Sequence, residues 1–195
     1  AALVLPLHYS YGLSVLHSHL AVGASLWLHP GTVLDPGFLP QLAASGASSF
    51  AGVPHHFRML ETALAGAPLP PALDCMTVAG GAMPPAEVLR WTARLGERAG
   101  RFVVMYGQTE ATARIAYLPP DQAARAPDAI GRAIPGGALS LRDDTGAPIT
   151  APGHEGELIY RGPNVMMGHA DSAADLTRSH ETGWLATGDM AMLGA

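Results

Sequence analysis

The chain has 195 residues, of which 48% are hydrophobic and 14% are charged, and its formal net charge is −5. The hydrophobic content excludes a disordered chain, and the lack of any lysine–arginine cluster argues against a nucleic-acid-binding surface. The single cysteine, Cys75, excludes an intrachain disulfide and is typical of a cytoplasmic protein, and no apolar run predicts a membrane span.

Short apolar runs alternate with helical patterns through the first two thirds of the chain. The patterns predict helices over 12–23, 35–46, 54–65 and 84–100, and strands over 24–29, 48–53, 73–80 and 101–105. In the second helix we expect Asp35 as the N-cap, Pro36 as the first residue and Gly46 at the end. Gly100 is expected to end the last helix. Strands that alternate with helices predict an α/β fold with a mostly parallel sheet flanked by helices.

The pattern changes after about residue 128. Residues 138–149 are typical of a hairpin with a turn at 143–146, and residues 156–162 alternate like a half-buried strand. The last third is therefore expected to form a small β-rich lobe. The sequence predicts one α/β subdomain over 1–128 and a β-rich subdomain over 129–195, which we expect to be incomplete.

Two polar, glycine-containing stretches follow predicted strands. They are TVAGGAMPP at 77–85 and MYGQTEAT at 105–112. Ligands of open parallel sheets bind beyond the carboxyl ends of the strands, so both stretches are expected at one crevice. Tyr106 offers a stacking face, Thr109 can donate to an anionic oxygen, and Glu110 is a hard oxygen ligand suited to Mg²⁺. These residue types indicate a nucleotide site rather than a hydrolase site.

The competing interpretation is that both stretches are ordinary strand-to-helix turns. That interpretation suits an isolated Gly-Gly turn better than it suits MYGQTEAT, because MYGQTEAT contains several specific polar residues in direct succession. His55 and His56 are candidate metal ligands, but no second histidine or cysteine pair lies at zinc spacing. No Gly-x-Ser-x-Gly elbow is present, which weakens a serine-hydrolase interpretation.

Several segments resemble, in order and spacing, the motifs of the adenylate-forming superfamily, which includes acyl-CoA synthetases, peptide-synthetase adenylation domains and firefly luciferase. YGQTE resembles its Tyr-Gly-x-Thr-Glu motif, and VAGGAMPP resembles the Gly-Gly segment upstream of that motif. The other matching segments are LPLHYSYGL (5–13), EGELIYRGPNVMMGH (155–169) and GWLATGDMA (183–191). Together they extend over nearly the whole chain.

The resemblance implies a role for each matching residue of the nucleotide site. The expected adenylate-binding residues are Gly80, Gly81, Ala82, Tyr106, Gly107, Gln108, Thr109 and Asp189. Among them, Tyr106 would stack on adenine and Asp189 would accept hydrogen bonds from the ribose hydroxyls. The residues expected to act in catalysis are Thr109, which would bind the α-phosphate, and Glu110, which would hold Mg²⁺.

The resemblance also implies an acyl pocket. Its expected lining residues are Tyr9, Tyr11, Gly12, His55, Gly81 and Gln108. Many family members carry a histidine where this chain has Tyr9, so a catalytic role for His8, one residue earlier, is doubtful. Gly168-His169 replaces the family's Gly-Tyr pair.

The sequence contains no Ser/Thr/Gly-rich phosphate loop with a lysine, and no Gly-Lys pair at all. The family's hinge and its C-terminal domain, with a catalytic lysine, have no counterpart here either. We therefore expect the chain to be the core of the large N-terminal domain of a longer enzyme, inactive by itself.

The implied function is that of an ATP-dependent carboxylic acid ligase. It would form an acyl-AMP with ATP and Mg²⁺ and pass the acyl group to coenzyme A or to the phosphopantetheine of an acyl or peptidyl carrier protein. Two alternatives are an isolated substrate-binding module and a peptide-synthetase domain that adenylates amino acids. No aspartate precedes Asp35 to pair with an ammonium group, which favours a simple carboxylic acid. A third alternative is an α/β protein that binds no nucleotide.

Overall fold

The computed structural model describes residues 1–177 and 183–194, and the chain divides into two compact units. The first unit comprises Ala1–Tyr106 and Ala116–Gly131, and the second comprises Gly107–Ile115 and Arg132–Ala195. The stretch MYGQTEAT is therefore divided between them after Tyr106.

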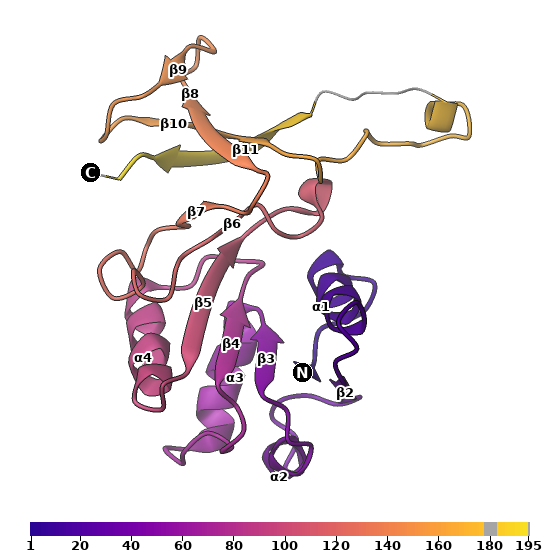
Figure 1. Cartoon of the computed structure of the whole chain (residues 1–195), viewed down its shortest axis with the longest axis vertical. Helices are drawn as coiled ribbons and strands as arrows, with labels where there is room; N and C mark the ends of the chain where they lie inside the picture. Colours follow the sequence, from indigo (N-terminus) through magenta and orange to yellow (C-terminus); the bar gives the residue numbers. More distant parts are fainter. Residues whose placement is uncertain (178–182, 195) are drawn as a thin grey trace. The chain divides into compact units, whose positions relative to one another are not determined.

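The first unit is built on a sheet whose strands follow the order β2-β1-β3-β4-β5-β6. In chain order these strands are β1 (Ala2–Leu3), β2 (Trp27–Leu28), β3 (Ser49–Gly52), β4 (Cys75–Val78), β5 (Arg101–Tyr106) and β6 (Ala116–Tyr117). Neighbours from β2 to β5 are parallel, as the arrowheads of β3, β4 and β5 show in Figure 1, whereas β6 pairs antiparallel with β5.

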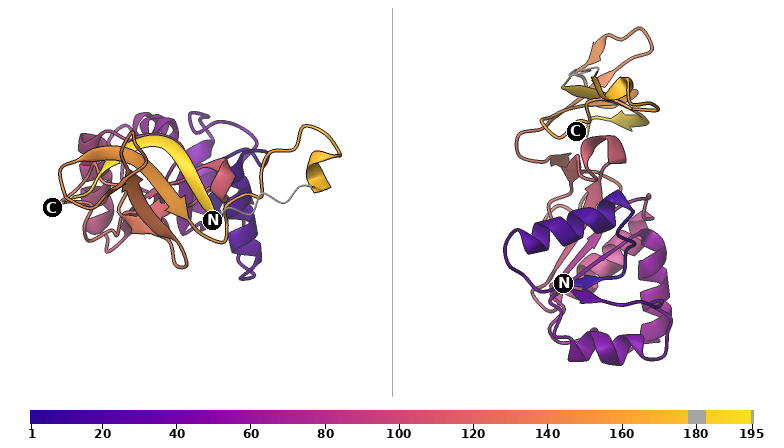
Figure 2. Two further views of the ribbon diagram at one scale, coloured as in Figure 1. Left: turned by 90° about the horizontal axis from the view of Figure 1, so that it is seen from above. Right: turned by 90° about the vertical axis from the view of Figure 1, so that its right-hand side faces the viewer.

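Helices cover both faces of this sheet (Figures 1 and 2). They are α1 (Ser10–Leu20), α2 (Phe38–Ala44), α3 (Pro54–Leu64) and α4 (Pro85–Gly96). Apolar side chains of α2, α3 and α4 pack in one cluster with Met76 of β4. Because side chains alternate along a strand, Thr77 points to the other face, where Tyr11 of α1 hydrogen-bonds to it. The expected mostly parallel sheet with flanking helices is confirmed.

Aromatic rings form the centre of the core in the first unit. Phe57 of α3 is fully buried and meets three rings edge-on, with centroids 5.7 Å from Phe50, 5.3 Å from Trp91 and 5.3 Å from Phe102. Such edge-to-face pairs stabilise a core beyond the effect of burying their area. Phe57 therefore ties α3 to α4 and to two strands. In residues 1–177 and 183–194, no helix has the length and apolarity that a bilayer span requires.

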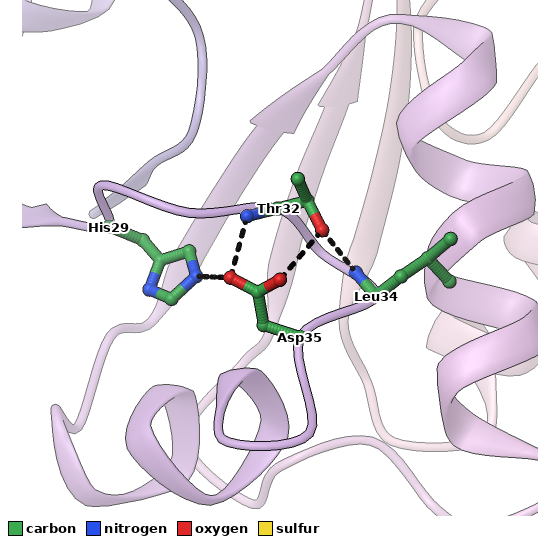
Figure 3. Close-up of polar contacts among 4 residues, drawn as sticks. All are labelled: His29, Thr32, Leu34 and Asp35. Carbon is green, nitrogen blue, oxygen red and sulfur yellow. Dashed lines mark hydrogen bonds and ion pairs between the residues drawn. The ribbon is translucent and has the colours of Figure 1, made fainter.

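The start of α2 differs from the expectation. The helix begins at Phe38, so the prediction of Asp35 as N-cap and Pro36 as first residue is wrong. The Asp35 carboxylate instead accepts hydrogen bonds from the backbone N–H and the hydroxyl of Thr32, at 2.8 and 3.0 Å, and lies 3.3 Å from Nε2 of His29 (Figure 3). These bonds, first of all that from the Thr32 backbone, lower the pKa of Asp35. A carboxylate bound to the preceding loop does not cap the helix that follows.

The end of α4 also differs from the expectation, because the helix stops at Gly96 rather than continuing to Gly100. The left-handed residue of this turn is Ala99, with φ 56°. Gly100 donates its N–H to the Leu95 carbonyl at 2.8 Å, and a Cβ on it would lie 2.7 Å from the carbonyl oxygen of Asp74. Close backbone approach, and not a positive φ, is what requires glycine at this position. The other expected helices and strands of the unit are present with shifted ends.

The second unit is β-rich, as expected. Its elements are η1 (Thr109–Ala111), β7 (Arg132–Ala133), β8 (Ala138–Arg142), β9 (Pro148–Ile149), β10 (Glu155–Arg161), η2 (Asp175–Thr177) and β11 (Trp184–Met192). The antiparallel sheet has the order β11-β10-β8-β9. The hairpin predicted over 138–149 is confirmed. Asp143 closes its turn by accepting hydrogen bonds from Thr145 and Ala147, and these bonds, led by that from the Thr145 hydroxyl, lower the pKa of Asp143.

Candidate functional site

In the first unit, the expected site residues after β4 lie in an exposed turn. It contains Gly80, Gly81 and Ala82. Gly80 has φ +76°, and a Cβ on it would lie 2.2 Å from the Tyr9 hydroxyl oxygen, far inside contact distance. Glycine is therefore favoured here by the backbone conformation, and a Cβ would force the Tyr9 hydroxyl to move away from the turn. The structure thus brings together Tyr9 and Gly80, which the sequence predicted from separate segments.

Tyr11 and Gly12 hold the start of α1 against the sheet. The Tyr11 side chain is 2% exposed, and its hydroxyl lies 2.6 Å from the Thr77 hydroxyl and 3.0 Å from the Thr77 carbonyl oxygen, to which it donates. A Cβ on Gly12 would lie 2.3 Å from the Pro6 carbonyl oxygen. Both residues therefore position the segment that carries Tyr9 next to the Gly80 turn.

The histidine pair lies at the start of α3, close to the same turn. Pro54 is the nearest neighbour of a Cβ placed on Gly81, at 3.6 Å, which leaves room for a side chain there. His55 is exposed, whereas Nδ1 of His56 accepts a hydrogen bond from the Val53 N–H at 3.2 Å. Burial lowers the pKa of His56, and the charge of His55 lowers it further. Within residues 1–177 and 183–194, no cluster of three or more His, Cys, Asp or Glu side chains is arranged to hold a metal ion.

In the second unit, residues 107–115 form a tightly closed loop. Ala111 and Ala113 donate their N–H groups to the carbonyl of Gln108 at 3.1 and 3.0 Å. Thr112 and Ala113 both have positive φ, at 54° and 70°, which L-residues adopt only under constraint. A Cβ on Gly107 would lie 2.1 Å from the Ala113 carbonyl oxygen, so only glycine allows the loop to close. Thr109 and Glu110 are carried on this loop.

Asn164 holds the loop from outside, a role that its residue type did not predict. Its amide donates to the carbonyls of Ala111 at 2.7 Å and Arg114 at 3.1 Å. Its side-chain oxygen accepts a hydrogen bond from Tyr160 at 2.7 Å. The strained backbone of the loop is thus fixed by one side chain from the segment after β10. Asn164 lies within EGELIYRGPNVMMGH, one of the segments that resemble family motifs.

Tyr160 and Met166 complete this support. Tyr160 is fully buried, and a Cβ on Gly162 would lie 2.3 Å from its hydroxyl oxygen. Burial raises the pKa of Tyr160, and the bond to Asn164 partly opposes that shift. The Met166 N–H donates to the carbonyl of Glu110 at 2.7 Å. The backbone around Glu110 is therefore held by hydrogen bonds from a segment more than fifty residues away in the chain.

Asp189 lies in an irregular part of the antiparallel sheet. Glu157 of β10 pairs with Met190 of β11, but Ile159 pairs with Ala186. Residues 187–189 of β11 therefore lie opposite a single residue of β10. Such a bulge redirects side chains that a regular ladder would fix on one face.

Side chains and a glycine stabilise this bulge. Gly188 has φ +73°, and its N–H donates to Oε1 of Glu157 at 3.2 Å. The Thr187 hydroxyl donates to the Leu158 carbonyl at 2.8 Å and accepts from the Asp189 N–H at 3.2 Å. The Asp189 carboxylate, which is exposed, accepts a hydrogen bond from the Gln108 amide at 3.1 Å.

Each unit thus gathers part of the predicted site. The first brings Tyr9 to the Gly80 turn, and the second joins the loop that carries Thr109 and Glu110 to Asp189 through Gln108. The expected contacts of these residues with a nucleotide, a metal ion or an acyl group stay predictions.

Comparisons with known proteins all match the chain to AMP-binding enzymes or their relatives. The model of the family described as AMP-binding enzyme matches residues 1–169. The chain is 34% identical over 115 residues to an indoleacetate–CoA ligase of Aromatoleum aromaticum, which is 59% of this chain and 22% of the ligase. It is 32% identical over 144 residues to the syringomycin synthase SyrB1 of Pseudomonas syringae, which is 72% of this chain and 23% of the synthase. The chain therefore spans less than a quarter of the length of these two relatives.

A solved structure supports the same relationship. The fold matches o-succinylbenzoate coenzyme A synthetase (MenE) from Bacillus subtilis in complex with AMP, with a TM-score of 0.79 and 25% sequence identity. The match covers 98% of this chain and 38% of that protein.

Proposed function

The chain belongs to the AMP-binding enzyme family, and from this premise we propose that it supplies the acyl- and adenylate-binding residues of a longer ATP-dependent acid–thiol ligase. The observation that carries the proposal lies within the second unit. There the loop that holds Thr109 and Glu110 is hydrogen-bonded through Gln108 to Asp189. The residues proposed to bind the phosphate, the metal ion and the ribose are thus connected by hydrogen bonds within one unit.

Residues of the first unit are assigned to the adenine and the acyl group. The Gly80 turn would border the adenine and the acyl group, because its glycines present backbone without side chains to a flat ligand. Tyr106, at the end of β5, would stack on the adenine ring. Tyr9 and the exposed His55 would line the acyl pocket, with Tyr11 and Gly12 fixing the backbone that carries Tyr9.

In the second unit, we assign the phosphate and ribose side. The exposed Thr109 would donate its hydroxyl to an α-phosphate oxygen, and Asp189 would accept hydrogen bonds from the ribose hydroxyls. Mg²⁺ is commonly held by one or two carboxylates together with substrate phosphates, so the single carboxylate of Glu110 fits an ion that arrives with the nucleotide. When bound, that ion would neutralise phosphate charge.

The proposed reaction has two steps. A carboxylate oxygen of the acid attacks the α-phosphorus of ATP, the bond to the β-phosphate oxygen breaks, and pyrophosphate leaves. A thiol of coenzyme A or of a carrier phosphopantetheine then releases its proton to solvent and its sulfur attacks the acyl carbonyl, forming a thioester, while the acyl–phosphate bond breaks and AMP leaves with its electrons. Neither step needs a protein nucleophile, so this chain's part is to align groups and stabilise charge, as in other phosphoryl transfers. The sequence contains no lysine, so any lysine that assists would come from outside these residues.

A second candidate is adenylation of an amino acid for a carrier protein. The similarity to syringomycin synthase SyrB1 over 72% of the chain favours it, whereas the similarity to indoleacetate–CoA ligase favours a simple acid and coenzyme A. The lack of an aspartate before Asp35 supports the simple acid.

Pyrophosphate exchange into ATP, measured on the longer protein across a panel of simple carboxylic and amino acids, tests the proposal. We expect exchange that depends on one class of acid, and a loss of about 10²-fold in Thr109→Val, which keeps the shape and removes the hydroxyl. Thr150→Val, an exposed site, is the matched control and should exchange normally. For the 195 residues alone we expect no exchange. Absence of acid-dependent exchange in the longer protein would contradict the proposal.

A further inference from the structure

Gln108 connects two segments of the second unit that lie about eighty residues apart in the chain. Its Nε2 atom donates to the backbone carbonyl of Thr187 at 2.7 Å and to Oδ2 of Asp189 at 3.1 Å. Both partners lie in the bulge of β11, and Gln108 itself precedes the η1 turn. One side-chain amide therefore joins the closed loop to the bulge.

The orientation of this amide follows from its partners. A carbonyl oxygen and a carboxylate can only accept hydrogen bonds, so the amide must present its NH₂ group and not its oxygen to them. The two N–H hydrogens meet two acceptors, so both donors are used. A hydrogen bond to an ionised carboxylate is stronger than one between neutral groups.

The bulge alone does not fix the Asp189 carboxylate. The positive φ of Gly188 and the bonds of Thr187 define the backbone path, but an exposed aspartate side chain can adopt several rotamers on a fixed backbone. The bond from Gln108 narrows the choice among those rotamers, because it places a donor 3.1 Å from Oδ2.

We propose that Gln108 is a positioning residue, whose amide holds the Asp189 carboxylate in the orientation that accepts hydrogen bonds from the ribose hydroxyls of a bound adenylate. The inference rests on the proposed function. Thr109 and Glu110 follow Gln108 directly in the chain. The bond from Gln108 to Asp189 therefore also links the residues proposed for the phosphate and the metal ion to the carboxylate proposed for the ribose. The preference for ligands that carry ribose hydroxyls then depends on Gln108, although Gln108 need not touch those hydroxyls.

The test compares two ligands that differ only in those hydroxyls, AMP and 2′,3′-dideoxy-AMP, by calorimetric titration of the full chain. The wild type should bind AMP more tightly. In Gln108→Met, which keeps the side-chain length and removes the amide, we expect that preference to fall about tenfold, the size expected for one bond to a charged group, with dideoxy-AMP affinity retained. Retained dideoxy-AMP binding also shows that the variant is folded. Gln122→Met, at an exposed site, is the matched control and should keep the wild-type preference.

A second variant separates positioning from packing. Gln108→Glu has nearly the same shape but places a carboxylate beside Asp189, so it should lose the preference for AMP at neutral pH. As the pH falls toward about 4–5, one carboxyl of the pair takes up a proton and can donate again, so the ratio of the two affinities should recover. A purely structural defect would leave that ratio unchanged with pH.

The outcomes distinguish the two claims. Failure of the wild type to bind AMP would overturn the proposed function, and this inference with it. A wild type that prefers AMP, together with a Gln108→Met variant that keeps the full preference, would overturn the inference alone.

Discussion

The two units hold their candidate site residues in different ways. In the first, the Gly80 turn follows a strand whose neighbours are fixed by a packed core, and Phe57 with its three aromatic neighbours forms the centre of that core. In the second, the loop 107–115 and the β11 bulge are held mainly by hydrogen bonds from Asn164 and Gln108. Substitutions should therefore act through global stability in the first unit and through local order in the second.

The largest effect is expected from the core of the first unit. Phe57→Ala removes a fully buried ring and its edge-to-face contacts, and should lower the free energy of unfolding by about 3–5 kcal/mol. Urea unfolding of the chain measures this change. Leu89→Ala on α4 is the control, since Leu89 is 41% exposed and its loss should change stability far less. Equal losses of unfolding free energy in the two variants would mean that the aromatic core is not the main source of stability in the first unit.

Gly107→Ala should damage the second unit without touching that core. The new Cβ would collide with the backbone carbonyl of Ala113, so residues 107–115 must open, and we expect AMP affinity to fall at least about tenfold. Titration calorimetry measures the loss. Gly96→Ala is the matched control, because that helical glycine has open space around it and alanine there should stabilise α4 by about 0.5–1 kcal/mol. Unchanged AMP binding in Gly107→Ala would disprove the closed loop.

Asn164→Asp tests whether hydrogen bonds order the loop. The carboxylate can still accept from Tyr160, but it can no longer donate to the carbonyls of Ala111 and Arg114, which should weaken the loop by about 1–3 kcal/mol. Amide hydrogen exchange across 107–115 should accelerate, while exchange in β3 to β5 stays as slow as before. Acceleration across both units would instead indicate a global loss of stability.

The smallest effect concerns His56. Burial lowers its pKa in the folded chain, so at pH values below its unfolded pKa of about 6.5 the unfolded chain binds more protons. Its contribution to stability is therefore complete above the unfolded pKa and is lost as the pH falls below that value and through the lower pKa of the folded chain. We expect His56→Gln to flatten the decline in the free energy of unfolding between pH 7 and 5, by less than about 1 kcal/mol because the ring is only half-buried. The exposed His55→Gln should flatten the decline less, because it removes only the smaller part of the shift, which comes from the charge of His55.

The first unit was the easier to predict from the sequence. Strands β2 to β5, the helices α3 and α4, and the Gly80 turn depend on local patterns of apolar residues, proline and glycine, whereas the two-residue strands β1 and β6 were not predicted. The errors there were also local. Asp35 and Gly100 have the residue types of helix ends, but a loop threonine bonds to the carboxylate of Asp35, and a neighbouring backbone requires Gly100.

In the second unit β8, β9 and β10 were predictable, but β7, β11 and the contacts that support the loop were not. Thr109 and Glu110 were candidates from their residue types, and Asp189 was a candidate only through the resemblance to the adenylate-forming superfamily. It could not indicate that Asn164 supports the loop or that Gln108 bonds to Asp189, because those contacts join residues about fifty to eighty positions apart. Nor could it place the bulge, since Thr-Gly-Asp is compatible with a turn as well as with a strand.

The central claim is that these residues bind an adenylate, and binding of an acyl-adenylate analogue tests it most directly. We predict saturable binding by the wild type, with affinity at least about tenfold weaker in Tyr106→Ala and in Asp189→Ala, because each removes one contact with the nucleoside. Affinity unchanged in both variants, or no binding by the wild type, would contradict the account and indicate an α/β protein that does not bind nucleotides.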